Sequence, residues 1–113
     1  MRIDCEEPGF ESAYIDIETS RWTRPEVDVL TRGAATEKWF EVVRRKCKAL
    51  SLPVLEGEPV TVPDQLTAAA LDRLDYVLFN WVVAAVTKAG REVIHLGNAP
   101  WRRLSATPET DAA

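Results

Sequence analysis

The stretch from Leu71 to Leu96 constrains the fold of this 113-residue chain more than any other part. Its apolar residues recur with the i, i+3, i+4, i+7 spacing of one helix face, and others cover much of the opposite side. A surface helix needs only one apolar stripe, about 100° wide. We therefore expect this helix to be central to the fold or to meet another chain. The expected core stripe is Leu71, Leu74, Leu78, Trp81, Val82, Ala85, Val86, Ala89 and Val93, and the second side is Tyr76, Val77, Phe79 and Val83.

The N-terminal region predicts a β-hairpin. Residues 10–18 alternate in type, with aliphatic side chains on one side only, which is typical of a half-buried strand. Residues 2–5 come before a turn signal at Pro8-Gly9, and we expect them to pair with that strand. Val60 to Val62 is predicted as a further short strand. An isolated hairpin is marginal in water, so this one is expected to lie on a helix.

Three helical segments are predicted. The first begins at a capping box formed by Thr23 and Glu26. The second runs from Thr36 to Leu50 on an apolar stripe. The last runs from Thr67 to Leu96 and would be about 45 Å long at 1.5 Å per residue. A helix of that length is expected to bend at Gly90 or to project beyond the core.

These elements together define the expected fold class. It is α+β and mainly α: an N-terminal β-hairpin packed on a small bundle of about three helices, with one long C-terminal apolar helix. Residues 1–104 are expected to form a single globular domain. Residues 105–113 lack apolar anchors and are predicted to be a disordered tail.

Charge and composition narrow the classes of partner. The net charge of −4 argues against general nucleic-acid binding, which needs a basic footprint. The polar N-terminus predicts no signal peptide, and the apolar run Tyr76 to Val86 is shorter than the ~20 residues of a membrane span. We therefore expect a soluble cytosolic protein with no membrane partner. A basic cluster, Arg44, Arg45, Lys46 and Lys48, is either a solvated face or a surface that steers a partner.

Residues that could perform chemistry are few. His95 is the only histidine, and nothing in the sequence places a nucleophile beside it. Asp72 and Asp75 lie three residues apart on the predicted helix. Near a helix N-terminus the helix dipole stabilises acidic side chains, which explains these two residues without catalysis. Cys5 and Cys47 are too few for a disulfide framework, and Cys47 is expected to be a small buried thiol. The sequence therefore predicts no catalytic residue, no metal site and no cofactor, and a protein that is not an enzyme.

Contact with other proteins is the better-supported role. The second apolar side of the long helix offers anchors for a partner, and Trp and Arg are enriched among binding hot spots. Trp101 and Arg102 follow the last helix; in the alternative interpretation Trp101 folds back onto the core. The predicted partner-binding residues are Tyr76, Phe79, Trp81, Val83, Trp101 and Arg102. Homo-oligomerisation through the same helix is a further prediction.

The order of these segments resembles the tail assembly chaperones of long-tailed bacteriophages. The resemblance lies in YIDI (14–17), WTRPEVDVL (22–30), KWFEVV (38–43), VTVPDQLTAAALDRLD (60–75) and YVLFNWVVAAV (76–86). It implies a small protein of the host cytoplasm, made together with a frameshifted longer form. It also implies binding to the tape measure protein and help in recruiting tail tube subunits.

Three alternatives to the chaperone remain open. The first is a small structural protein of the virion, such as a connector or tail completion protein. The second is a small enzyme or ligand-binding protein with a polar pocket lined by Asp72, Asp75 or His95. The third is a dimeric transcriptional regulator that uses the helix from Thr36 to Leu50, which the net acidity disfavours.

Overall fold

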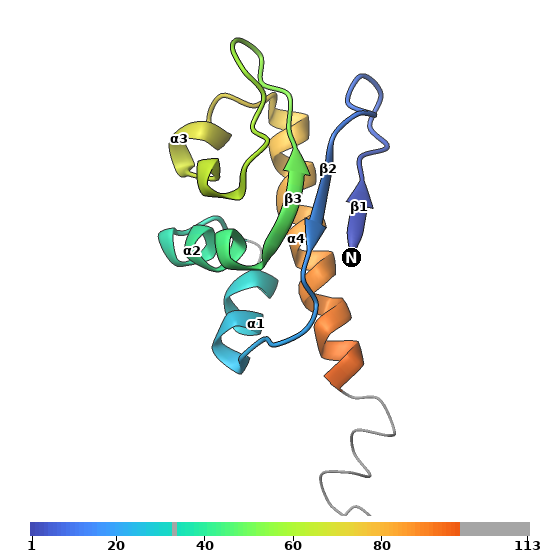
Figure 1. Cartoon of the computed structure of the whole chain (residues 1–113), viewed down its shortest axis with the longest axis vertical. Coiled ribbons are helices and arrows are strands. Elements are labelled where there is room, and N and C mark those ends of the chain that lie inside the picture. The colour runs from blue at the N-terminus through green and yellow to red at the C-terminus, as the bar shows by residue number, and fades with distance from the viewer. Residues whose placement is uncertain (33, 98–113) are drawn as a thin grey trace, which may run out of the picture.

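The computed structural model describes residues 1–32 and 34–97, and it has the predicted α+β class (Figure 1). The predicted tail at 105–113 lies outside the described residues, as do Trp101 and Arg102. The elements in chain order are β1 (Arg2–Asp4), β2 (Tyr14–Ile17), α1 (Arg24–Thr31), α2 (Glu37–Lys46), β3 (Cys47–Ser51), the 3-10 turn η1 (Pro63–Gln65), α3 (Ala68–Leu71) and α4 (Tyr76–Gly97).

The sheet has three antiparallel strands in the order β1-β2-β3. The predicted hairpin is confirmed, with Ile3 of β1 opposite Ile15 of β2. Ile15 and Ile17 are fully buried, whereas Tyr14 and Asp16, which alternate with them, are only half-buried. The strand therefore turns one face to the core and the other to solvent. Figure 1 shows α4 running behind the sheet, where it covers the buried face.

Helix α1 begins at the predicted capping box and packs against α4. The backbone N–H of Thr23 donates to Oε1 of Glu26 at 2.8 Å, and Oγ1 of Thr23 accepts from the N–H of Glu26 at 3.4 Å. At the other end of α1, the hydroxyl of Thr87 donates to the carbonyl oxygen of Leu30 at 3.5 Å. The α1–α4 contact closes the lower half of the core, and α2 packs on α1 beside it.

The predicted second helix, Thr36 to Leu50, is wrong in its last turn. Helix α2 ends at Lys46, and the chain continues directly as β3. Leu50 lies opposite Ile15 of β2, so pairing with an existing strand replaces the last helical turn. The predicted strand at Val60 to Val62 is also wrong, because only Val60 pairs, in a single bridge with Leu52.

The predicted continuous helix from Thr67 to Leu96 is two helices. Thr67 caps α3, but α3 ends at Leu71. Asp75 then starts α4, since its Oδ1 accepts from the backbone N–H of Val77 at 2.9 Å. Asp72 and Asp75 therefore cap different helices and do not share a helix face. Helix α4 runs through Gly90 without interruption. Among residues 1–32 and 34–97, none of the helices has the length and apolar content needed to cross a membrane.

Candidate partner-binding surface

Helix α4 buries a single stripe, and this confirms most of the predicted core face. That stripe packs against β2 on one side and α1 on the other. Trp81 and Val93, predicted in the same stripe, are only half-buried: Trp81 lies at the edge of the stripe, and Val93 lies near the C-terminal end of α4, where it lines a hollow. The buried α4 side chains are Leu78, Val82, Ala85, Val86 and Ala89.

The second apolar side of α4 is exposed only at the start of the helix. Tyr76 is 75% exposed and Val77 is 46% exposed. Phe79 and Val83 are half-buried and pack against the core, so they do not lie on a fully exposed side of the helix; their predicted contact with a partner or a second copy stays a prediction. At 3.6 residues per turn, these two residues and Tyr76 share one flank of α4, and Trp81 lies on the opposite flank. The structure thus does not bring Trp81 together with Tyr76, Phe79 and Val83.

A hollow lies where α3 turns into α4, and we call it the α3–α4 corner. It has a volume of about 370 Å³ and is lined by Leu71, Asp72, Leu74, Tyr76 and Phe79. Leu71 and Leu74 are buried, whereas Tyr76 extends into solvent beside them. The lining is apolar except for Asp72. This shape can receive an apolar side chain from outside, with an aromatic ring at its rim.

Trp81 belongs to a different surface, the groove between β1 and α4. This β1–α4 groove has a volume of about 290 Å³. Ile3, Trp81 and Ala84 supply apolar side chains, and acidic and basic residues form its rim. Its lining residues are Ile3, Asp4, Glu6, Glu7, Trp81, Ala84, Ala85 and Lys88. Sequence reasoning missed this groove, because the approach of residues 3–7 to α4 is a long-range contact.

The basic cluster at the end of α2 and in β3 makes hydrogen bonds and ion pairs within the chain. Arg44 donates to the carbonyl oxygen of Leu66 at 2.7 Å, which ties α2 to η1. Arg45 and Lys46 both pair with Glu26, at 2.9 and 3.3 Å. Lys48 lies 3.8 Å from the carboxylate of Glu18. These contacts favour a role inside the fold over the predicted steering of a partner.

Among the residues that the structure describes, Glu26 is the charged residue buried at the edge of the core, and its surroundings keep it ionised. Burial alone would raise the pKa of this carboxyl. The backbone N–H of Thr23 and the side chains of Arg45 and Lys46 outweigh burial and lower the pKa to about 2. Glu26 is therefore a structural anion that joins α1 to α2.

The residues considered for chemistry lie apart from one another. His95 is exposed in the last turn of α4, whereas Asp72 and Asp75 flank the break before that helix. Burial raises the pKa of the Cys47 thiol to about 11, so the thiolate is scarce at neutral pH. In the part of the chain that the structure describes, no three His, Cys, Asp or Glu side chains are grouped to hold a metal ion.

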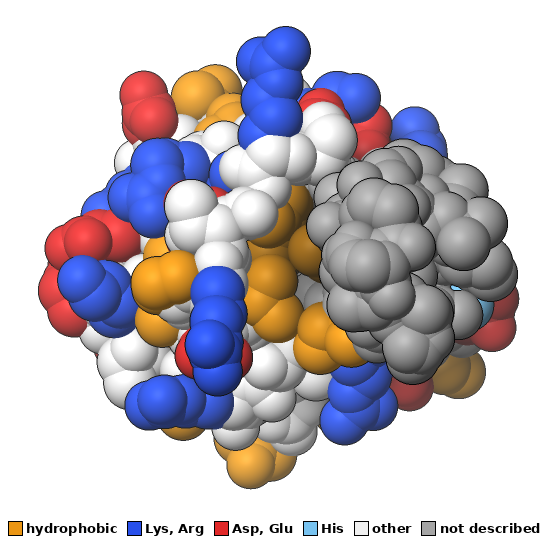
Figure 2. Space-filling view, turned by 90° about the horizontal axis from the view of Figure 1, so that it is seen from below, with side chains coloured by type: hydrophobic (Ala, Val, Ile, Leu, Met, Phe, Trp, Pro, Cys, Tyr) orange, Lys and Arg blue, Asp and Glu red, His pale blue; other side chains and the backbone are white. Residues whose placement is uncertain are grey.

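A third hollow lies at the lower end of the molecule. It has a volume of about 440 Å³, and Trp22, Val93 and Leu96 supply its apolar lining beside Arg21. Figure 2, which views this end, shows Lys and Arg side chains around a central apolar area. Lys46 holds the local backbone here, because its ammonium donates to the carbonyl oxygen of Arg21 at 2.8 Å and lies 5.8 Å from the centre of the Trp22 ring.

No family model matches this chain, and no curated protein or solved structure matches it either.

Proposed function

We propose that this chain is an assembly protein that binds an apolar helical segment of a partner at the α3–α4 corner. The observation that carries the proposal is the 75% exposed ring of Tyr76 at the rim of a hollow floored by Leu71 and Leu74. An exposed aromatic beside a preformed apolar hollow is the usual composition of a binding hot spot. An amphipathic helix presents anchors at i, i+3, i+4 and i+7, of which one fits the hollow and the next lies along Tyr76 and Val77.

We further propose that the partner is a tape measure protein and that the chain is a tail assembly chaperone of a long-tailed phage, acting in the host cytoplasm. The resemblance in segment order supports this choice of partner. A chaperone that yields to tail tube subunits needs moderate, reversible binding. A small apolar hollow with an exposed rim is suited to that, because it offers few anchors and little charge.

The proposal assigns no catalytic role to any residue. Cys47, with its raised pKa, is a poor nucleophile. The alternative proposal is a small structural protein of the virion, a connector or tail completion protein. Mass spectrometry of purified particles separates the two, since a structural protein remains in the particle and a chaperone leaves it.

Co-expression with the tape measure protein tests the proposal directly. Wild-type chain should raise the soluble fraction of that protein. Tyr76→Asp should abolish the gain and weaken binding at least tenfold, because it places a charge at the rim of an apolar hollow. Tyr76 suits this test better than Phe79, since a charge at the half-buried Phe79 would also damage the core.

Ile94→Asp is the matched control, because Ile94 is a 44% exposed apolar residue near the other end of α4. It adds the same charge and should keep wild-type activity. Circular dichroism melting should show that both variants are folded. A Tyr76→Asp variant that solubilises the partner as well as wild type does would contradict the proposed surface. If wild-type chain gives no gain in solubility, the chaperone function itself is wrong.

A further inference from the structure

Strand β1 leaves one edge of the sheet without a partner strand in the described residues. The N–H of Cys5 donates to the carbonyl oxygen of Ala13 at 2.9 Å, so the odd-numbered residues around β1 bond to β2. Bonded and non-bonded positions alternate in an antiparallel ladder. Arg2 and Asp4 therefore direct their backbone N–H and C=O groups outward. Figure 1 shows β1 as the outermost strand, with β2 on one side and no other described element on its outer side.

We propose that this edge pairs with the same edge of a second copy of the chain, forming a two-fold symmetric dimer with a continuous six-stranded sheet. Antiparallel pairing centred on Ile3 places Arg2 opposite Asp4 of the second copy, and Asp4 opposite Arg2 of the second copy. Both positions have outward backbone groups, so each pair exchanges two hydrogen bonds. The two-fold axis thus gives every outward backbone group of β1 a hydrogen-bond partner in the second copy, and both copies use the same residues.

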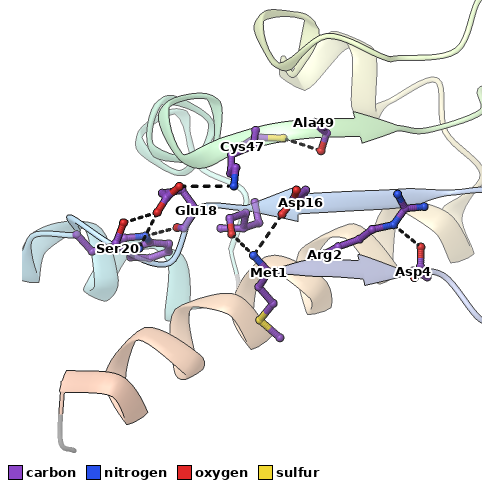
Figure 3. Close-up of polar contacts among 11 residues, drawn as sticks. Met1, Arg2, Asp4, Asp16, Glu18, Ser20, Cys47 and Ala49 are labelled. Carbon is purple, nitrogen blue, oxygen red and sulfur yellow. Dashed lines mark hydrogen bonds and ion pairs between the residues drawn. The ribbon is translucent and has the colours of Figure 1, made fainter.

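The side chains are complementary in the same register. The guanidinium of Arg2 lies 3.8 Å from the centre of the Tyr14 ring, and its Nε donates to Asp4 at 2.9 Å (Figure 3). These contacts hold the opposite charges on the open face of the sheet, at its edge. In the dimer each arginine faces a carboxylate across the axis, a stabilising cross-strand pair.

The other face of the edge is apolar and also self-complementary. Ile3 is half-buried on the α4 side of β1, where it lines the β1–α4 groove with Trp81 and Ala84. Two-fold pairing brings Ile3 against Ile3 of the second copy and places the two grooves side by side. The dimer therefore covers apolar surface on one face of the sheet while it pairs charges on the other. A strand of unrelated sequence would meet the same backbone groups without this charge register, which is why a second copy is the favoured occupant.

Sedimentation equilibrium of the full chain tests the dimer. Wild-type chain should show a concentration-dependent dimer. Asp4→Arg should raise its dissociation constant at least tenfold, since the symmetry turns both cross-strand pairs from attractive to repulsive. Glu58→Arg is the matched control, because it makes the same charge change at an exposed position of the connector and should leave the dimer unchanged. A monomeric wild-type chain at all concentrations, or a dimer indifferent to Asp4→Arg, would overturn the proposal.

Mixing two variants tests the register itself. Asp4→Arg and Arg2→Asp should each be monomeric alone, because like charges then face each other. Mixed, they should form a heterodimer, since every cross-strand pair is again opposite in charge. The amide hydrogens of Arg2 and Asp4 should exchange slowly in the heterodimer and in wild type, and fast in the separate variants. Failure of the folded variants to associate on mixing would reject this register. A protected Arg2 amide in monomeric wild type would show that the edge is already covered and would reject the dimer.

Discussion

At the scale of single residues, Glu26 shows how this small core tolerates a charge. Its carboxylate receives a backbone N–H from Thr23 and pairs with Arg45 and Lys46, which come from the next helix. The side chain is only 11% exposed. A carboxylate so placed costs little as long as all its donors are present, and removal of its charge takes away one acceptor oxygen and leaves two cations without their counter-charge.

Glu26→Gln should therefore destabilise the protein in a pH-dependent way. The pKa of Glu26 is lowered from 4.5 to about 2 in the folded state, so its contribution is fully present above pH 4.5 and is lost as the pH falls towards 2. We expect the variant to lose about 2 kcal/mol of unfolding free energy at pH 7, a value reduced for partial solvation. Urea denaturation at pH 7 and at pH 2.5 measures the difference, which should fall to about a quarter of its pH 7 value at the lower pH, where the Glu26 carboxyl is still partly ionised in the folded state. The exposed Glu41→Gln serves as control. An equal loss at both pH values would mean that shape, rather than charge, is what Glu26 supplies.

At the scale of elements, the sequence predicted correctly those helix starts and strand faces that depend on residues close together in the chain. The Thr23–Glu26 capping box and the alternation that buries Ile15 and Ile17 were both readable, because each depends on residues close in the chain. Strand β3 could not be predicted from the sequence. Val43, Cys47 and Leu50 have helical spacing, and only the distant β2 makes the last of them a strand residue.

The break between α3 and α4 was not predicted either, because the apolar spacing alone does not show it. Leu71, Leu74 and Leu78 suit one continuous helix as well as two. This missed break also affected the candidate surface. Tyr76 is exposed, as predicted, but Phe79 is half-buried at the α3–α4 corner, which the break creates. Trp101 and Arg102 stay predictions, as they lie outside the described residues.

The contact between α1 and α4 depends on the absence of a side chain at position 90. A β-carbon there would lie 2.9 Å from Cγ2 of Thr31. Thr31 cannot easily rotate away, since its hydroxyl donates to the carbonyl oxygen of Val27 at 2.8 Å. Glycine in a helix interior costs about 1 kcal/mol relative to alanine, and the close packing outweighs that cost.

Gly90→Ala should therefore destabilise the protein by about 1 kcal/mol, although it improves helix propensity. In a Thr31→Ser background the methyl group that clashes is gone and the hydroxyl stays, so the same change should stabilise by about 1 kcal/mol. Thermal denaturation of the four proteins of this double-mutant cycle gives the coupling energy. A stabilising effect of Gly90→Ala in the wild-type background would show that the helices can separate without loss.

At the scale of the whole molecule, the sheet depends on α4 for the cover of its apolar face. Ile15 and Ile17 are fully buried, and α4 packs across β2. A fragment of residues 1–75 should therefore show no cooperative thermal transition, because a small sheet with an open apolar face is not stable alone. Addition of a synthetic peptide of residues 76–97 should restore the transition in circular dichroism. Cooperative melting of the fragment alone would show that α1, α2 and the sheet are self-sufficient.

This dependence also sets an order of events during synthesis. The strand that carries Ile15 and Ile17 leaves the ribosome well before the helix that covers it. At 5–20 residues per second, the 58 residues from 18 to 75 take about 3–12 s to make. Throughout that interval the nascent hairpin presents its aliphatic face to solvent, and the chain can complete its core only when α4 has emerged.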